Sequence, residues 1–501
     1  MLERQIGTTK ESPITFVELP PTSGGRLDGQ RAEDVYSKLR LPPRAIPLLH
    51  PIVERAGYKD VVSIAPQYNP ESKLTDGDWK RIVSSDVLAL SSISRTITQT
   101  EELAREYKRL NPRGLVIVGG FHASSLPEEC LKWADIVVRG EGEQTLSELM
   151  TALEDNGSPK GVKGVSYKRG DEVVHEPSRE GLSEEQLANL PSPIYSEAVQ
   201  KGKRTNTEFT SRGCPFGCNY CLVPTFYGNY FRRKPNEVII AQLKALPQGS
   251  TFIIDDNLAG KPRETTELLG LMKEEGLNRN SYTIQVRAQA GLIKDLPEHL
   301  SQAGIQWATV GIESLTDETL KQIGKKTTSA QNKEGVRSLR ERLRVHGMFM
   351  IGLDGDTPES VRETLEWAKY NVDTAQFFAP APLPGTEFAQ QMEDQGRVLS
   401  KEYYLYDGQN VLLRPLHFSP YQLQQTIINM YKEFYSFKLF GDRVGKAFFG
   451  AFISRKTSAG QAWDHLKYDL LIRTYARWFA IRSFINDPQT QRHLTNLKAW
   501  S

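Results

Sequence analysis

The segment 211-SRGCPFGCNYC-221 places three of the chain's four cysteines within eight residues. Thiolates this close together can bind three corners of an iron–sulfur cube, whereas a [4Fe-4S] cube normally takes four cysteine ligands. No fourth cysteine lies nearby, so the pattern predicts that Cys214, Cys218 and Cys221 leave one iron open to another molecule. Zinc is the main alternative, but structural zinc prefers four ligands, and an odd trio cannot pair off completely as disulfides.

Length and composition indicate a soluble protein of several domains. A chain of 501 residues is too long for one core and predicts about three domains. The net charge of only +2 gives no reason to expect nucleic acid as a partner, and no apolar stretch is long enough to cross a bilayer. The first residues, MLERQIGTTKES, lack the apolar core of a signal peptide. We expect the remaining cysteine, Cys130, to be a small buried hydrophobe, and the whole protein to be cytoplasmic.

Short apolar runs alternate with helix-like stretches in the first 150 residues: ITFVEL, VVSIAP, VLALSSI, LVIVGG and DIVVRG. Runs without polar alternation, separated by single helices, predict a doubly wound α/β domain with a parallel sheet covered on both faces. Ligands of such sheets bind beyond the carboxyl ends of the strands. In this chain those ends carry small or polar residues, namely Ser91, Ser92, Gly119, Gly120, His122, Glu141 and Glu143.

A hairpin over 163–178 and a proline-containing linker at 190–195 separate this domain from a second α/β series. The runs TFIIDD, YTIQVRA, WATVGIES, GMFMIGL and TAQFFAP, with helices between them, predict a full or partial TIM-type barrel. Beyond residue 400 the pattern turns helical, with helices expected over 421–440 and 462–486. The predicted domains are 1–190 with the hairpin linker, 200–395 for the barrel, and 396–501 for a helical domain that caps the barrel or binds substrate.

The CxxxCxxC loop, with Tyr220 before its last cysteine and βα units after it, resembles the radical S-adenosylmethionine (SAM) superfamily. The resemblance implies that Cys214, Cys218 and Cys221 bind a [4Fe-4S] cluster whose fourth iron chelates SAM. Residues near strand ends then become candidates for SAM binding: Tyr220, Asp255, Asp256, Asn257, Arg287, Glu313 and Gly352.

Each of these candidates has a structural alternative. The segment 255–257 stands where many superfamily members have Gly-Gly-Glu-Pro, and it is equally typical of a helix N-cap. Glu313 ends the run WATVGIES, where an unpaired buried carboxylate would be costly without a ligand. Arg287 is expected either to meet the SAM carboxylate or to form an ion pair, for instance with Glu313.

The first domain, placed ahead of such a barrel, resembles cobalamin-binding domains, and VGGFHASSLPEE and DIVVRGEGEQTLSEL match that branch closely. The usual Asp-x-His-x-x-Gly motif is replaced by 18-ELPPTSGG-25, so no histidine is expected there as a lower ligand of cobalt. Ser91, Ser92, Gly119 and Gly120 remain to accommodate the cobalamin tail. His122 is expected to touch the corrin or to cap its loop, and the segment 140–143, with Glu141 and Glu143, either contacts the cofactor or forms a domain joint.

The resemblance therefore implies an enzyme with three cofactors, a [4Fe-4S] cluster, SAM and cobalamin. We expect a C-methyltransferase that acts on an unactivated carbon through a 5'-deoxyadenosyl radical and methylcobalamin. One alternative is an oxidative cyclase of the magnesium-protoporphyrin ester cyclase type, and another is a sensor without turnover. The substrate is expected to be a small molecule, including lipid or tetrapyrrole-like compounds, and the reductant a flavodoxin or ferredoxin.

Overall fold

The computed structural model describes residues 7–29, 31, 41–202, 205–228, 230–439, 441, 474, 477–478, 480 and 488–500. The chain forms two compact units. The first comprises Met1–Lys261, Pro382–Asp394 and Lys401–Asp407, and the second comprises Pro262–Ala381, Gln395–Ser400 and Gly408–Ser501. The division into three domains at residues 190–200 and 395 stays a prediction.

The first unit contains a seven-stranded sheet in the order β2-β1-β3-β4-β5-β6-β7. The five strands β1 to β5 are parallel, and β6 and β7 are added as an antiparallel hairpin. Their bounds are β1 Ile14–Glu18, β2 Val61–Ile64, β3 Val87–Ser91, β4 Leu115–Gly119, β5 Ile136–Val138, β6 Val165–Arg169 and β7 Glu172–His175. Both the parallel sheet and the hairpin over 163–178 are therefore confirmed.

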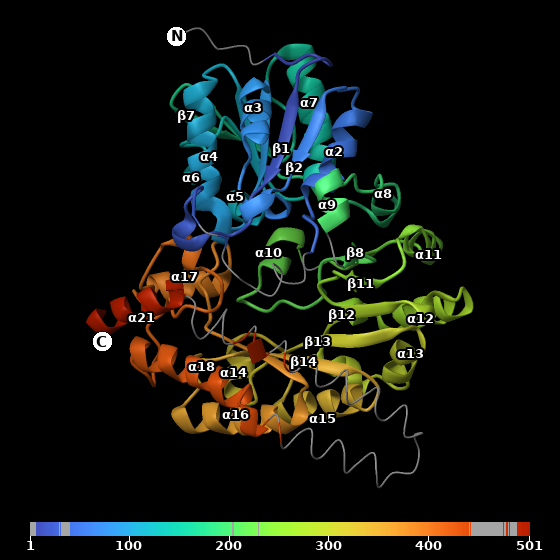
Figure 1. Ribbon diagram of the computed structural model, residues 1–501, viewed down its shortest axis with the longest axis vertical. Coiled ribbons are helices and arrows are strands. Elements are labelled where there is room, and N and C mark those ends of the chain that lie inside the picture. The colour runs from blue at the N-terminus through green and yellow to red at the C-terminus, as the bar shows by residue number, and fades with distance from the viewer. Residues whose placement is uncertain are drawn as a thin grey trace. The chain divides into compact units, whose positions relative to one another are not determined.

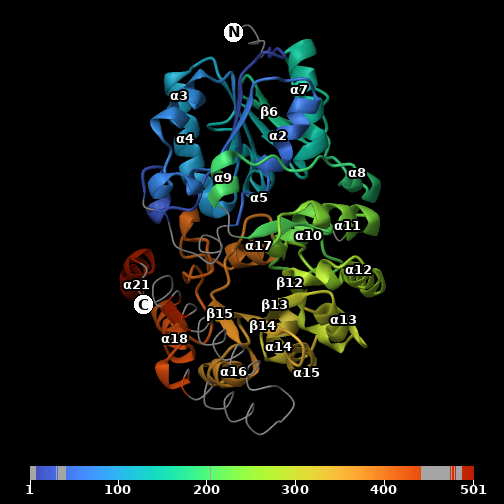
Figure 2. The same ribbon diagram turned by 45° about the vertical axis from the view of Figure 1, so that its right-hand side comes forward.

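Helices cover both faces of this sheet (Figures 1 and 2). On one face, α2 (Ile46–Arg55) and α7 (Gly142–Asn156) pack on side chains such as Phe16 and Ala89. On the other face, α3 (Asp76–Ser84), α4 (Ile97–Leu110) and Cys130 at the end of α6 (Pro127–Cys130) pack around Leu88 and Val116. Two separate cores, one on each face, are what a doubly wound domain requires. Cys130 is fully buried, as expected.

The rest of the first unit carries the cysteine segment. Strand β8 (Asn206–Glu208) pairs in parallel with β11 (Ser250–Ile253), and β9 (Ser211–Arg212) pairs antiparallel with β10 (Arg232–Arg233). The three cysteines lie between β9 and α10 (Leu222–Tyr227). The further helices of this unit are α5 Phe121–Ser125, α8 Glu184–Ala188, α9 Glu197–Gly202, α11 Asn236–Ala245 and α17 Glu387–Asp394.

The second unit contains four parallel strands that pair in chain order: β12 Ser281–Arg287, β13 Ile305–Glu313, β14 Arg344–Met350 and β15 Thr374–Phe378. The helices before and between them are α12 Pro262–Glu274, α13 Leu296–Gln302, α14 Asp317–Gln322, α15 Ser329–Arg340 and α16 Pro358–Asn371. Together with β11, these strands coincide with the five predicted apolar runs.

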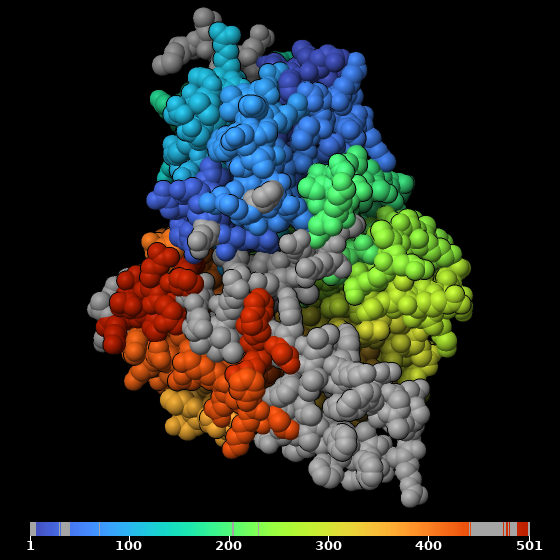
Figure 3. Space-filling view, in the orientation of Figure 1, coloured from blue at the N-terminus to red at the C-terminus, as the bar shows by residue number. Residues whose placement is uncertain are grey.

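The described part of the C-terminal region is largely helical. Helix α18 (Pro420–Phe434) is shorter than predicted, and α21 (Pro488–Trp500) lies beside it (Figure 3). The helix expected over 462–486 lies almost entirely outside the described residues. None of the described helices combines the length and apolar content that crossing a membrane requires.

Candidate functional site

The three cysteines of the segment 214–221 are partly exposed thiols rather than members of disulfides. The Cys221 N–H donates to the Cys218 carbonyl oxygen at 3.1 Å, which bends this part of the loop into a turn. Burial raises the pKa of the Cys221 thiol to about 12, and the neighbouring Cys218, Asp256 and Cys214 add to this effect. The three sulfurs therefore lie within electrostatic reach of one another, in surroundings that disfavour thiolates unless a cation is bound.

This donor set fits an iron–sulfur cluster. Soft thiolates are the ligands that such clusters take, and each sulfur binds a different iron atom of the cube. No three His, Cys, Asp or Glu side chains within the described ranges gather as they would around a single metal ion. Half-buried Tyr220 precedes the third cysteine, and the Asn219 carbonyl accepts from the Phe388 N–H of α17 at 3.0 Å, so the loop is anchored to the same unit.

Asp255, which follows β11, is occupied by contacts within the chain. Its carboxylate accepts from the Thr210 N–H at 2.6 Å, the Ser211 N–H at 3.1 Å and the Ser211 hydroxyl at 2.7 Å, and it also accepts from the Thr210 hydroxyl. The residue is only 1% exposed. Asp255 therefore fixes the start of the cysteine segment, and a role in SAM binding stays a prediction.

The two residues after Asp255 are less completely engaged. Asp256 accepts from the Gly213 N–H at 3.1 Å, and its burial raises the pKa of the carboxyl to about 6. Asn257 is 2% exposed, and its Oδ1 atom has no hydrogen-bond partner among the described residues. Asn257 does occupy the N-cap position of the short 3-10 helix Leu258–Gly260, as the N-cap alternative expected, but its side chain makes no cap bond there. A buried amide oxygen of this kind is suited to accept a hydrogen bond from a ligand.

In the second unit, Glu313 at the end of β13 forms an ion pair with Lys325, a residue that the sequence analysis did not name. Its Oε1 accepts from Lys325 Nζ at 2.8 Å, and the two side chains are 7% and 4% exposed. Arg287, at the end of β12, donates to the Lys325 carbonyl oxygen. Glu313 also has a φ of 64°, which a residue with a side chain rarely adopts and which is often found at functional sites.

Gly352, predicted to let the backbone approach adenine, has a structural reason of its own. Its φ is 98°, and a Cβ atom there would lie 2.3 Å from a methyl carbon of Leu423 in α18. Its N–H donates to Asp356 at 2.9 Å. Packing against α18 thus already requires glycine, and contact with adenine stays a prediction.

The carboxyl ends of β3 and β4 lie close together in the first unit. A Cβ atom on Gly120, whose φ is 103°, would lie 2.3 Å from the Ser92 carbonyl oxygen. Ser92 is 3% exposed, and its hydroxyl lies 3.1 Å from that of Thr96. Ser91 and Gly119 end β3 and β4 side by side, in register. The small side chains therefore allow these strand ends and the residues after them to pack closely. Their contact with the cobalamin tail stays a prediction.

His122 follows these strand ends in α5 and is 1% exposed. Its Nδ1 lies 3.0 Å from the Ser94 hydroxyl, and its ring meets the Tyr403 ring edge-on at 4.6 Å. Burial lowers the pKa of the imidazole to about 4, so the ring is neutral near pH 7. Its Nε2 is buried with no hydrogen-bond partner within the described part of the chain. A neutral imidazole with one unused nitrogen fits a domain that binds a large polar cofactor.

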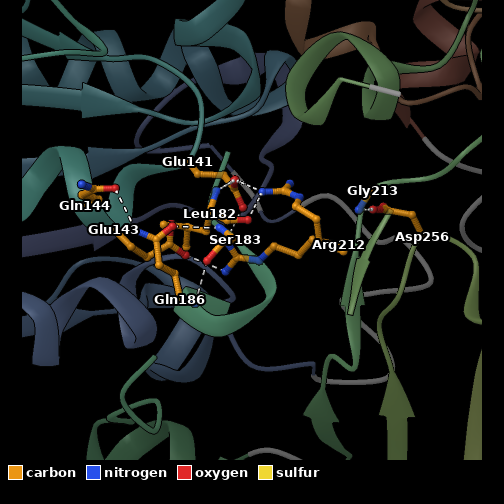
Figure 4. Close-up of polar contacts among 10 residues, drawn as sticks. Glu141, Glu143, Gln144, Leu182, Ser183, Gln186, Arg212, Gly213 and Asp256 are labelled. Carbon is orange, nitrogen blue, oxygen red and sulfur yellow. Dashed lines mark hydrogen bonds and ion pairs between the residues drawn. The ribbon is translucent and has the colours of Figure 1, made fainter. Parts of the chain in front are cut away.

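Glu141 and Glu143, at the start of α7, contact arginines rather than open solvent (Figure 4). Arg212 Nη1 lies 2.8 Å from Glu141 and its Nη2 lies 2.5 Å from Glu143, while Arg232 Nη1 lies 2.5 Å from Glu141. Burial favours the neutral acid, yet the attraction of Arg212 holds the pKa of Glu143 below its usual range. Sequence reasoning missed Arg212, Arg232 and Lys325, although carboxylates expected near buried strand ends call for nearby cations.

Comparisons with known proteins agree with both predicted domains. The family model of the B12 binding domain matches residues 35–150, and that of the radical SAM superfamily matches residues 209–368. The chain is 28% identical to the anaerobic magnesium-protoporphyrin IX monomethyl ester cyclase of Cereibacter sphaeroides, over 79% of this chain and 67% of the relative. It is 25% identical to the bacteriochlorophyllide d C-12(1)-methyltransferase of Chlorobaculum tepidum, over 70% of this chain and 75% of that protein.

Among solved structures, the fold resembles the radical SAM methyltransferase TsrM from Kitasatospora setae, whose structure contains cobalamin and a [4Fe-4S] cluster. The TM-score is 0.61 and the identity 16%, over 77% of this chain and 78% of TsrM. The predictions of a doubly wound B12 binding domain and of a radical SAM domain are confirmed by these matches.

Proposed function

We propose, from the presence of a B12 binding domain and a radical SAM superfamily domain in one chain, that the protein is a cobalamin-dependent radical SAM methyltransferase. Its substrate would be a small molecule with an unactivated carbon. The observation that carries the proposal is the cysteine loop, in which three partly buried thiols lie in the same compact unit as the sheet of the B12 binding domain. Several relatives named as methyltransferases support the choice of reaction.

The chain's own residues would hold three cofactors. Cys214, Cys218 and Cys221 would bind a [4Fe-4S] cluster, and the fourth iron would remain open to SAM. Bound together, the cluster and SAM supply a 5'-deoxyadenosyl radical, and cobalamin carries the methyl group. In the first unit, Asn257 Oδ1 and His122 Nε2 are buried polar atoms without partners among the described residues, so Asn257 is the best candidate there for SAM and His122 for cobalamin.

The other predicted contacts remain part of the proposal. Tyr220, Asp255 and Asp256 in the first unit, and Arg287, Glu313 and Gly352 in the second, would contribute to SAM binding or support residues that do. Ser91, Ser92, Gly119 and Gly120 would line the cobalamin tail. We further propose a cytoplasmic location and a small reducing protein, a flavodoxin or ferredoxin, because a low-potential cluster needs an electron donor.

An oxidative cyclase is the second candidate, because a relative at 28% identity carries that name. The test is anaerobic reconstitution with iron, sulfide and cobalamin, followed by addition of SAM and a chemical reductant. Formation of both 5'-deoxyadenosine and S-adenosylhomocysteine supports the methyltransferase. Deoxyadenosine alone favours cyclisation or oxidation, and the absence of both products contradicts the proposal and favours a sensor.

Two cysteine variants make this experiment specific. Cys218→Ala should lose cluster iron and both products, because the cube loses one of its three protein ligands. Cys130→Ala is the matched control, since Cys130 is buried in the core of the first unit, away from the loop in sequence, and should retain iron and products. Unchanged product formation in Cys218→Ala would overturn the assignment of the cluster.

A further inference from the structure

Four charged side chains are buried together in the first unit, and we refer to Glu141, Glu143, Arg212 and Arg232 as the Glu–Arg joint. Figure 4 labels the first three of them. Three ion pairs of 2.5–2.8 Å connect them. Their side chains are only 5–12% exposed. Two carboxylates meet two guanidinium groups, so the formal charges within the joint balance.

The joint connects the B12 binding domain with the strand that leads into the cysteine loop. Glu141 and Glu143 follow β5 and lie within the region matched by the B12 binding domain model. Arg212 ends β9, two residues before Cys214, and Arg232 lies opposite it in the antiparallel partner β10. The segment between the two matched regions, residues 151–208, also takes part, because Glu141 accepts from the Leu182 N–H and Arg232 donates to the Leu182 carbonyl, both at 2.8 Å.

Arg212 is the central member of the joint. It contacts two carboxylates through two different nitrogens, and its guanidinium lies 4.8 Å from the centre of the Phe209 ring. The planar fork of an arginine fixes orientation as well as distance, which a lysine cannot do. In the described residues, Arg232 uses only Nη1 in polar contacts, because its Nε and Nη2 have no partner there.

Stability alone does not account for such a joint. Well-packed apolar residues of similar volume are often as stabilising as a buried ion network, because charges lose hydration on burial. A network with fixed directions does, however, specify one geometry between the parts that it joins. The position of the joint, between the edge of a cofactor-binding sheet and a cluster-binding loop, points to such a role.

We propose that Arg212 is a positioning residue, which through Glu141 and Glu143 holds the cysteine loop in one register with the carboxyl edge of the B12 binding sheet. The inference rests on the proposed function, because methyl transfer requires the two cofactors to be held at contact distance. Loosening the joint leaves cluster and cobalamin binding intact. It lowers the rate of the steps that need both cofactors more than it lowers the rate of SAM cleavage.

The experiment compares Arg212→Lys and Glu143→Gln with wild-type protein and with Arg179→Lys. Arg179 is a matched control: its side chain is 11% exposed and pairs with Glu148 on α7, so it too connects the segment 151–208 to α7, but the structure shows it in no contact with the cysteine segment. Glu143→Gln is nearly isosteric and serves if the lysine variant folds poorly. Iron, sulfide and cobalamin content establish that each variant loads normally.

The first readout is hydrogen exchange in protein without cofactors, followed by mass spectrometry of peptides covering 211–221. Both joint variants should exchange there about tenfold faster than wild type, because the segment opens more easily once the fork is lost. Arg179→Lys should leave this segment unchanged. Equal exchange in all four proteins would overturn the proposal, whatever the enzymatic activity.

The second readout uses loaded protein. Pulsed electron paramagnetic resonance between cob(II)alamin and the reduced cluster should show a broader distance distribution in the joint variants, and S-adenosylhomocysteine formation should fall about tenfold while deoxyadenosine formation changes little. An equal loss of both products with an unchanged distance distribution would overturn the positioning role. If wild type forms neither product, the proposed function fails, and the exchange comparison still decides whether Arg212 holds the loop.

Discussion

Replacing Asp255 by alanine should destabilise the start of the cysteine segment. The carboxylate accepts four hydrogen bonds, two from backbone N–H groups and two from the hydroxyls of Thr210 and Ser211. Each bond to a charged acceptor contributes about 1.5–3 kcal/mol. The gross loss is reduced because the hydroxyls find other acceptors and the carboxylate no longer has to be desolvated. We therefore expect a local destabilisation of about 3–5 kcal/mol, the usual cost of removing one side of a buried charged contact.

Asp256→Ala is the matched control, because among the described residues the neighbouring carboxylate accepts a single hydrogen bond, from the Gly213 N–H. Burial already raises the pKa of its carboxyl to about 6, so loss of its charge should cost less than about 1 kcal/mol. The assay is hydrogen exchange of peptides covering 206–213 in cofactor-free protein. Asp255→Ala should accelerate exchange there at least about 100-fold, and Asp256→Ala less than about tenfold.

The reasoning is refuted if the two variants exchange alike. If Asp255→Ala instead weakens SAM binding without any change in exchange, the carboxylate is a ligand contact, and the four hydrogen bonds do not hold the strand. The second outcome would support the SAM contact that the resemblance to the superfamily implies for Asp255.

Three further predictions concern other buried groups. Glu313→Gln or Lys325→Met should each cost about 3 kcal/mol, because one buried charge loses its partner, whereas the double variant should recover most of the loss in a double-mutant cycle read from exchange at β13. His122 has a pKa lowered to about 4 by burial, so its contribution to stability is complete above pH 6.5 and declines as the pH falls towards 4. Wild type should therefore lose about 2 kcal/mol more than His122→Gln between pH 7 and pH 5, measured by urea unfolding, and parallel pH profiles would contradict this. Cys221, whose thiol pKa is raised to about 12, should be alkylated much more slowly at pH 8 in folded cluster-free protein than in denatured protein, as mass spectrometry would show.

Much of the fold could be predicted because its signals are local. The ten apolar runs of the sequence, each of six to eight residues, correspond to β1–β5 and β11–β15, and helices between consecutive runs imply parallel pairing. The position of the cysteine loop after a strand also followed from chain order. In each case the residues that determine the structure are neighbours in the sequence.

The partners of the charged residues could not be predicted in this way, because they are distant in sequence. Asp255 meets residues about 45 positions earlier, and Arg212 meets carboxylates about 70 positions earlier. For Glu313 a contact with SAM or with Arg287 was expected, because nothing in the pattern around it identifies Lys325, which a turn after α14 brings back to the end of β13. The same limit explains why Gly120 and Gly352 were attributed to ligand contacts: the backbone of Ser92 and the side chain of Leu423 are not visible from the glycines themselves.

The contacts around the cysteine loop suggest that the chain folds before a cluster is inserted. Asp255 and Arg212 fix the backbone before the loop through buried polar contacts, and the Asn219 carbonyl accepts a hydrogen bond from α17 within it. Small metal-binding domains commonly obtain their folding free energy from the metal, because nothing else orders their ligands. In this chain the ordering comes from acids and arginines that do not bind the metal, so iron-free protein should keep 206–212 protected from exchange while the thiols stay available for cluster assembly. The loop is then a preformed binding site for the cluster, and the residues that shape it lie in the sequence on both sides of the cysteines.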